Sequence, residues 1–149
     1  MIGAIIARKS IAGAFRALNR HDLAGFMSNW ADDACFIYPG DISESGTFIG
    51  RSEVERWFEN FFIQFPRIEF SIRDISVRDI FATGGSNVVA VHWDLELTNR
   101  DGRKGENSGV TVITIRKGKV VQVKDYIFDL GEKFRLNWSA KSEGMNANR

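Results

Sequence analysis

The sequence has few of the cysteine and histidine residues that disulfide-bonded proteins and zinc proteins require. Its 149 residues include one cysteine, Cys35, which excludes an intramolecular disulfide and any cluster of thiolate metal ligands. The two histidines, His21 and His92, argue against a zinc site, because zinc takes several Cys, His or carboxylate ligands. We therefore expect a protein that works without a metal and without a cofactor.

An excess of one charge and long hydrophobic runs are missing too. Lys and Arg number 20 against 19 Asp and Glu, so the net charge of +1 lacks the basic excess of a nucleic-acid binder. No stretch approaches the roughly 18 consecutive apolar residues of a membrane span. The apolar residues 1–7 precede Arg8 and Lys9, which reverses the order found in a signal peptide. These patterns predict a cytoplasmic protein with no nucleic-acid partner and no membrane partner.

Aromatic residues, by contrast, are plentiful, with 12 Phe and 4 Trp in a chain long enough for one domain with its own core. Apolar residues at helical spacing predict helices over 3–19 and 23–31, the second opened by Asp22 as its N-cap. Ser52, with Glu55 in a capping box, predicts a third helix that runs to about Gln64 before Pro66.

Short apolar runs and two-residue periodicity predict the strands. Residues 34–38 and 47–49 form a short hairpin, and four further strands follow as a meander: one from Ile68 to Val77 with a bulge near Asp74, then 87–98, 106–116 and 119–128. Separate blocks of helices and antiparallel strands indicate an α+β fold, a cone-shaped curved antiparallel sheet packed on three helices with a cavity at one end. We expect one domain over 1–135 and a mobile tail over 136–149.

The strand 87–98 has two different faces. One face carries His92 beside Asp94, and a carboxylate next to an imidazole forms an acid–base pair because it raises the histidine pKa. The alternative is a strand edge whose polar groups are only solvated. The opposite face carries Trp93 and Leu95 among other apolar residues, and it would form a large exposed patch unless something covered it.

Asp125 is the one charged residue on an otherwise aliphatic face of the strand 119–128. Aliphatic neighbours remove water from a carboxylate, so its pKa should rise into the working range of a general acid or base. The alternative is an aspartate at the end of the sheet that pairs with an arginine or caps a loop.

Several short motifs together resemble one superfamily. They are Asp22-Leu23, Trp30 to Ala34, Pro39-Gly40 and Gly50-Arg51 near the start, and residues 118–121 and 124–130 near the end. Over about residues 10–135 this order is similar to the nuclear transport factor 2-like superfamily, with its SnoaL-like, ketosteroid-isomerase-like and limonene-epoxide-hydrolase-like branches. The resemblance implies a cystatin-like cone and, in many members, a dimer through the outer face of the sheet. We therefore expect a homodimer that buries Trp93 and Leu95.

The resemblance also implies candidate catalytic groups. The ketosteroid isomerase base, oxyanion tyrosine and second aspartate fall at Tyr38, Ala14 and Thr111, so that constellation is absent. The two aspartates of limonene epoxide hydrolase match Asp94 and Asp125, whereas its arginine position holds His92 and its water-holding residues fall near Phe36 and Tyr38. Scytalone dehydratase-like and cyclase-type members use His, Asp and Tyr in a similar cavity, a style that His92, Asp94, Asp125 and Tyr38 would suit.

We expect an enzyme of SnoaL-like type that performs cofactor-independent acid–base chemistry, as an isomerase, dehydratase or cyclase, on a small apolar, polyketide- or steroid-like molecule. Asp94 and Asp125 would be its acid and base, His92 a relay and Tyr38 an oxyanion donor. Alternatives are an epoxide hydrolase that uses Asp94 and Asp125, and a non-catalytic ligand- or protein-binding module. The candidate pocket-lining residues are Phe15, Trp30, Phe36, Trp57 and Phe61.

Overall fold

The chain folds into one curved sheet whose concave side holds helices. A computed structural model describes residues 2–139. Its elements in chain order are α1 (Ile2–Asn19), α2 (Leu23–Met27), β1 (Trp30–Tyr38), β2 (Gly46–Ile49), α3 (Arg51–Gln64), β3 (Arg67–Val77), β4 (Asn87–Thr98), β5 (Lys104–Arg116), β6 (Lys119–Ile127) and α4 (Glu132–Trp138). The strands form a single sheet in the order β2-β1-β6-β5-β4-β3.

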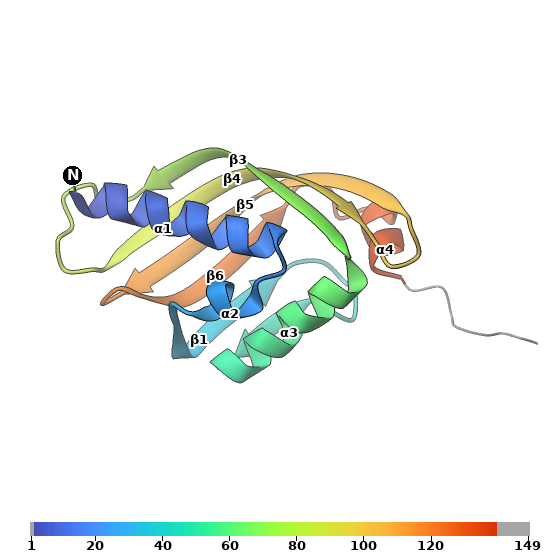
Figure 1. The fold of residues 1–149 in the computed structure, drawn as a ribbon, viewed down its shortest axis with the longest axis horizontal. Coiled ribbons are helices and arrows are strands. Elements are labelled where there is room, and N and C mark those ends of the chain that lie inside the picture. Colours follow the sequence, from blue (N-terminus) through green and yellow to red (C-terminus); the bar gives the residue numbers. More distant parts are fainter. Residues whose placement is uncertain (1, 140–149) are drawn as a thin grey trace, which may run out of the picture.

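The α+β architecture with a curved sheet is confirmed. Figure 1 shows α1 and α3 on the same side of the sheet, with β3, β4 and β5 arching over them toward α4. Two details correct the predicted antiparallel sheet on three helices: a fourth helix is present, and β1 pairs with β6 in parallel, so the sheet is mixed. The parallel pair joins the early hairpin to the later meander, so all six strands form one sheet.

The core lies between the helices and the concave face of the sheet. The helical stripe of Ile11, Phe15 and Leu18 is buried there, as predicted from its spacing. Phe36 of β1 is 1% exposed and packs edge-on against Trp57 of α3, with ring centroids 4.7 Å apart. Most of the aromatic excess therefore fills the interior of the domain.

Of the two N-caps predicted from the sequence, the one at the start of α2 is correct and the one at the start of α3 is wrong. Asp22 caps α2 as expected, because its Oδ1 accepts a hydrogen bond of 2.9 Å from the backbone N–H of Gly25. The capping box at Ser52 is wrong: α3 begins at Arg51, its N-cap is Gly50 with φ 94°, and no side chain caps it. A positive φ suits glycine, so the backbone turns into the helix two residues earlier than a cap at Ser52 would allow.

The second helix is also shorter than predicted. It ends at Met27, and β1 begins at Trp30, where the expected helix would have continued to residue 31. Pairing of Trp30 with Val120 of β6 extends the strand and stops the helix. The predicted bulge in β3 is present, as a register shift between Ile72 and Asp74.

The end of the domain lies further along the chain than predicted. Residues 136–138, assigned to the tail, belong to α4, and Trp138 is 8% exposed. Its indole packs against Phe65, with ring centroids 4.9 Å apart, so the core needs it. Residues 140–149 of the predicted mobile tail lie outside the described residues. Between residues 2 and 139 no helix has both the length and the hydropathy that crossing a bilayer requires.

Candidate active site

The apolar face of β4 points into the domain. Val89 and Val91 are fully buried, and Trp93 is 2% exposed. Trp93 packs edge-on against Phe70 of β3, which in turn packs against Phe15 of α1. The prediction that Trp93 and Leu95 form a dimer interface is therefore wrong, because the domain's own helices cover this face. Packing of the helices against the apolar face of β4 removes this large apolar surface from water, so a second subunit is not needed to bury it.

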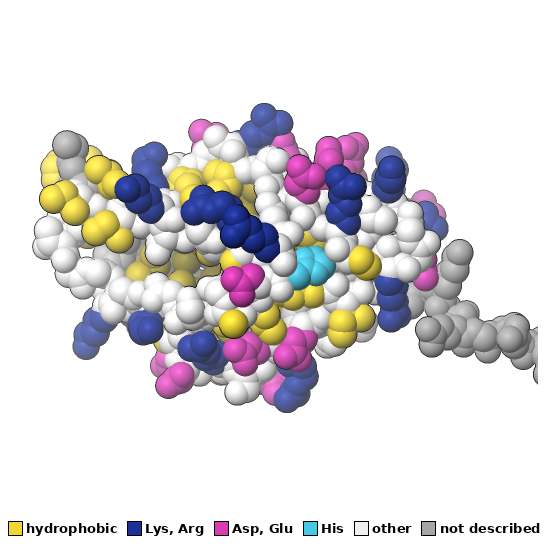
Figure 2. Space-filling view, in the orientation of Figure 1, with side chains coloured by type: hydrophobic (Ala, Val, Ile, Leu, Met, Phe, Trp, Pro, Cys, Tyr) yellow, Lys and Arg dark blue, Asp and Glu magenta, His cyan; other side chains and the backbone are white. Residues whose placement is uncertain are grey.

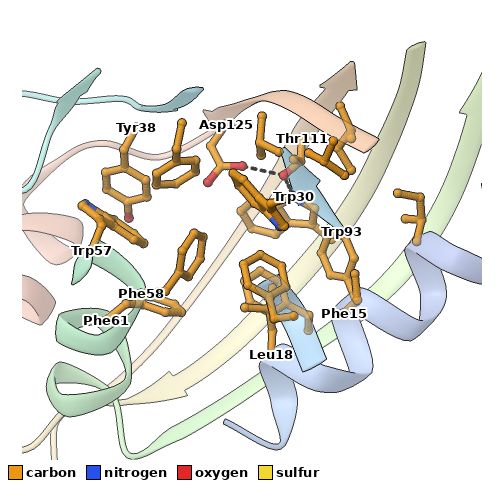
Figure 3. Close-up of a pocket in the computed structure, with 18 of the residues that line it drawn as sticks. Phe15, Leu18, Trp30, Tyr38, Trp57, Phe58, Phe61, Trp93, Thr111 and Asp125 are labelled. Atoms are coloured by element: carbon orange, nitrogen blue, oxygen red, sulfur yellow. Dashed lines mark hydrogen bonds between the residues drawn. The ribbon is translucent and has the colours of Figure 1, made fainter. Parts of the chain in front are cut away.

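A cavity lies between this face and the helices. Its volume is about 90 Å³, and ten of its lining side chains are aromatic. The five residues named as candidate pocket residues from the sequence all line it: Phe15, Trp30, Phe36, Trp57 and Phe61. A water needs roughly 10–15 Å³ of such space, so the cavity has room for a small ring and not for a large multi-ring molecule in this conformation. Figure 3 shows the aromatic rings arranged around it.

Asp125 brings a carboxylate into the cavity wall. It pairs across the sheet with Thr111, and the Thr111 Oγ1 to Asp125 Oδ1 distance is 2.6 Å. The indole N–H of Trp93 donates to Thr111 Oγ1 at 2.8 Å. Because Trp93 can only donate, the Thr111 hydroxyl proton is left to point at Asp125, and this chain of bonds has one direction (Figure 3).

The second carboxylate oxygen of Asp125 has a different environment. Within residues 2–139, Asp125 Oδ2 makes no hydrogen bond, and it is not one of the fully buried unpaired atoms. It is therefore accessible from the cavity. Burial raises the pKa of Asp125 to about 6, and the hydrogen bond from Thr111 opposes part of that rise. The carboxyl thus exchanges a proton near neutral pH, through an oxygen that faces the cavity.

Tyr38 lines the same cavity from β1. Its hydroxyl oxygen accepts a hydrogen bond of 3.1 Å from the indole N–H of Trp138. Burial raises its pKa above the ordinary value, and the nearby charge of Asp125 raises the pKa further, so the phenol stays protonated. Among the residues described here its own proton has no acceptor, which leaves it free for a bound molecule.

His92 and Asp94 lie on the opposite face of the sheet. Asp94 accepts a hydrogen bond of 2.7 Å from Ser108 and forms an ion pair with Arg73. The Ser108 hydrogen bond and then the Arg73 contact lower the Asp94 pKa, so this carboxylate stays ionised. His92 Nδ1 lies 3.7 Å from a carboxylate oxygen of Asp74 on the neighbouring strand. Neither residue lines the cavity.

The predicted pair of catalytic aspartates is therefore wrong. Asp125 pairs with Thr111, which pairs with Val91 on the inner face, whereas Asp94 alternates with Trp93 and points outward. The two carboxylates lie on opposite faces and cannot act on one molecule. This removes the epoxide hydrolase mechanism through Asp94 and Asp125, and it also removes His92 as a relay. Of the four candidate catalytic residues, Asp125 and Tyr38 share the cavity.

Comparison with known families agrees with this fold. Residues 11–123 match the family model of the SnoaL-like domain. The chain belongs to the SnoaL-like family. Among curated proteins, no sequence matches this SnoaL-like protein significantly.

Solved structures share the fold of this SnoaL-like protein at low sequence identity. An NTF2-like protein of unknown function from Burkholderia pseudomallei is 21% identical with a TM-score of 0.73, covering 89% of this chain and 97% of its own. A Bacillus subtilis protein provisionally described as an isomerase is 19% identical with a TM-score of 0.73, covering 93% and 98%. TerC, crystallised with polyporic acid, is 18% identical with a TM-score of 0.66, covering 80% and 88%. These likenesses show the nuclear transport factor 2-like fold.

Two hydrogen-bonding residues of the SnoaL-like site, Thr111 and Trp138, are not among the candidates predicted from the sequence. In the sequence, Thr111 occupies the position of the second aspartate of ketosteroid isomerase, and Trp138 lies in the segment predicted to be a mobile tail. The signal for Thr111 is its place opposite Asp125 in the β5–β6 hairpin. Trp138 is an isolated aromatic residue after a short helix, a pattern too common to mark a site. Across residues 2–139 no three His, Cys, Asp or Glu side chains are grouped so that they could hold a metal ion.

Proposed function

We propose that this SnoaL-like protein is an enzyme that moves protons, without a cofactor, on a small apolar molecule bound in the aromatic cavity. One observation carries the proposal: Asp125 lines a cavity of aromatic side chains, and its pKa is raised to about 6. No other carboxylate of the described chain lines that cavity. A general acid or base works best when its pKa lies near the working pH.

The proposed reaction starts with the ionised carboxylate. Asp125 Oδ2 removes a proton from a carbon next to a carbonyl group, and the electron pair of the broken C–H bond moves toward the carbonyl oxygen. The protonated Asp125 then returns the proton to another carbon of the same molecule, which completes an isomerisation. If the proton is instead returned to a leaving hydroxyl group, the product is a dehydrated molecule. Isomerisation and dehydration therefore both need a base such as Asp125 and a donor to the carbonyl oxygen.

Tyr38 supplies the second role. Its free hydroxyl proton can donate to the carbonyl oxygen as negative charge develops there. Trp138 donates to the Tyr38 oxygen and holds the phenol in place, and the raised pKa keeps it a donor throughout the physiological range. The Tyr38 donor favours a carbonyl compound, and the aromatic wall of the cavity favours a ring that fits among side chains such as Phe36 and Trp57.

Proton exchange tests this proposal with simple ketones in place of the natural substrate. The purified protein is incubated in D2O with a panel of small cyclic ketones, and loss of the α-proton signals is followed by NMR. We expect at least one ketone to exchange faster than in buffer, and Asp125→Asn to slow that exchange by two orders of magnitude or more (about 10²–10⁴-fold). Asp94→Asn, on the outer face, is the matched control and should not change the rate.

The same assay separates catalysis from the alternative of a non-catalytic binding module. That alternative is favoured by the scarcity of polar groups in the cavity wall, where Tyr38, Thr111 and Asp125 stand among apolar side chains. A binding module would hold ketones or aromatic rings with equal affinity in the wild type and in Asp125→Asn, and would exchange no protons. Ligand affinity from NMR shift perturbation, measured beside exchange, therefore decides between the two functions.

We also propose a homodimer, through the outer face of the sheet in place of the face that carries Trp93. Support comes from a partly exposed row across three strands, His92, Val110 and Tyr126, next to Phe128, which is 63% exposed. Light scattering should give the mass of two chains, and Val110→Asp should give one. A wild-type monomer at micromolar concentration would refute the dimer.

The single free cysteine, Cys35, fits our proposal of a cytoplasmic protein.

A further inference from the structure

Three segments far apart in the sequence meet at the end of the molecule where α1 begins. They are residues 2–9, the loop 78–82 and the turn 116–119, which together we call the basic tip. A Cβ on Gly3 would lie 2.7 Å from the carbonyl oxygen of Ala82, so α1 rests directly on the loop. The backbone N–H of Gly118 donates to Gly85 at 2.8 Å, and one groove is lined by Gly3, Ala82 and Gly118.

The basic tip exposes large apolar side chains. Their exposed fractions are 76% for Ile2, 53% for Ile5, 60% for Ile6, 44% for Ile80 and 75% for Phe81. Figure 2 shows hydrophobic side chains gathered at this end of the molecule. An exposed group of this kind, unlike single scattered residues, marks a surface that binds something apolar.

Positive charge surrounds these apolar side chains. The tip has six exposed cations and one carboxylate, Asp79, a net charge of +5 on a chain whose net charge is +1: Arg8, Lys9, Arg78, Arg116, Lys117 and Lys119. Lys and Arg side chains lie beside the apolar group in Figure 2. The partner of this surface must therefore be anionic and must also offer an apolar layer.

We propose that the basic tip docks on an anionic phospholipid surface. Ile5, Ile6 and Phe81 would enter the boundary between headgroups and acyl chains, while the surrounding cations pair with lipid phosphates and carboxylates. A second copy of the chain is a poorer partner, since tip-to-tip contact would bring two sets of six cations together. The proposal goes beyond the proposed proton-transfer function and departs from the expectation of no membrane partner.

Vesicle sedimentation tests the proposal with the full chain. Vesicles of phosphatidylcholine alone are compared with vesicles of phosphatidylcholine mixed with phosphatidylserine. We expect binding to the mixed vesicles that weakens as salt rises, because salt screens the cations. Removing two charges with Arg8→Gln and Lys9→Gln should weaken binding about 25-fold, at about fivefold per charge. Phe81→Ser should weaken it about tenfold.

Matched controls keep the result specific. Ile63→Ser on α3 removes a side chain that is 62% exposed and distant from the tip. Arg103→Gln with Lys104→Gln removes two charges at the β4–β5 hairpin, the opposite end of the molecule in Figure 1. Both controls should bind vesicles like the wild type, and all variants should keep the wild-type circular dichroism spectrum and melting temperature.

Four results would overturn the proposal. They are no binding to the mixed vesicles, equal binding with and without phosphatidylserine, equal losses in the tip and control variants, and a loss of dimer mass in light scattering when the tip is changed. The last result would make a second copy the occupant. Failure of proton exchange would leave this proposal intact, since the tip and the cavity share no residue.

Discussion

Asp125→Asn should make the protein more stable at neutral pH while it removes the proposed base. The native pKa of Asp125 is about 6, against an ordinary value of 3.8. The native state therefore holds a proton more tightly than the unfolded chain, and stability falls as pH rises from below 3.8 to above 6. Asparagine has nearly the same shape, keeps an oxygen that can accept from Thr111, and never ionises.

The size of the effect follows from the two pKa values. A shift from 3.8 to about 6 is about 2.2 units, which corresponds to about 3 kcal/mol at pH 8. Of this difference, about 1.4 kcal/mol develops between pH 5 and pH 8. Urea unfolding of both proteins at several pH values measures it directly, as a gap in the free energy of unfolding that widens with pH.

A gap that stays constant from pH 5 to pH 8 would overturn this prediction, because it would mean that Asp125 does not titrate in that range. A less stable Asp125→Asn at pH 8 would refute it as well. Asp94→Asn is the matched control: the native pKa of Asp94 is lowered, so its contribution has the opposite sign and is lost at acidic pH.

Three further predictions concern the neighbours of Asp125 and the sheet around them. Thr111→Val should raise the Asp125 pKa by about one to two units in an NMR titration, by loss of a 2.6 Å hydrogen bond, whereas Thr111→Ser should leave it near the wild-type value. Unequal proton-exchange rates in Asp94→Asn and the wild type would show that the outer face takes part in catalysis; we expect equal rates. Gly109→Ala should destabilise the protein by about 1–3 kcal/mol in thermal unfolding, because its Cβ would lie 2.7 Å from Trp93, whereas Gly84→Ala, with nothing within 4 Å, should be near neutral.

The periodic parts of the fold could be predicted because packing enforces them. The apolar stripe of Ile11, Phe15 and Leu18 lies on α1 as expected, and the two-residue alternation of 87–98 corresponds to β4. Alternation separates two faces, however, without saying which face is inside. The sequence predicts that the polar face with His92 and Asp94 lines the cavity. Burial of Trp93 and its apolar neighbours releases far more free energy, so the apolar face of β4 points inward and the polar face points outward.

Asp125 was found because a single charge on an aliphatic face is a strong signal. Its partner Thr111 was harder to find, because the β5–β6 hairpin contains an irregularity. Arg116 pairs with Lys119 beside the turn, and regular pairing from there would place Thr111 opposite Lys124. A register shift between Thr114 and Ile115 moves the pairing by one residue and puts Thr111 opposite Asp125.

The positions of helices α3 and α4 depend on backbone geometry and long-range contacts, which a local sequence pattern does not reveal. Gly50 begins α3 through a positive φ, and the cap predicted at Ser52 has no role there. The position of α4 depends on long-range bonds, such as the side chains of Gln64 and Asn99 donating to the carbonyl oxygen of Asn137. Trp138 reaches Tyr38 across 100 positions of sequence, so its part in the site could be seen only in the folded chain.

The proposed function requires that Asp125, a carboxylate in the cavity wall, gain and lose a proton near neutral pH. An NMR titration of the Asp125 carboxyl carbon in the wild-type protein, labelled with ¹³C at aspartate and assigned with Asp125→Asn, measures this pKa without a substrate. We expect one aspartate signal with a midpoint near pH 6, which disappears in Asp125→Asn. A midpoint for Asp125 at or below the ordinary value of 3.8 would mean that its place in the cavity does not raise the pKa, and it would remove Asp125 as the proposed base.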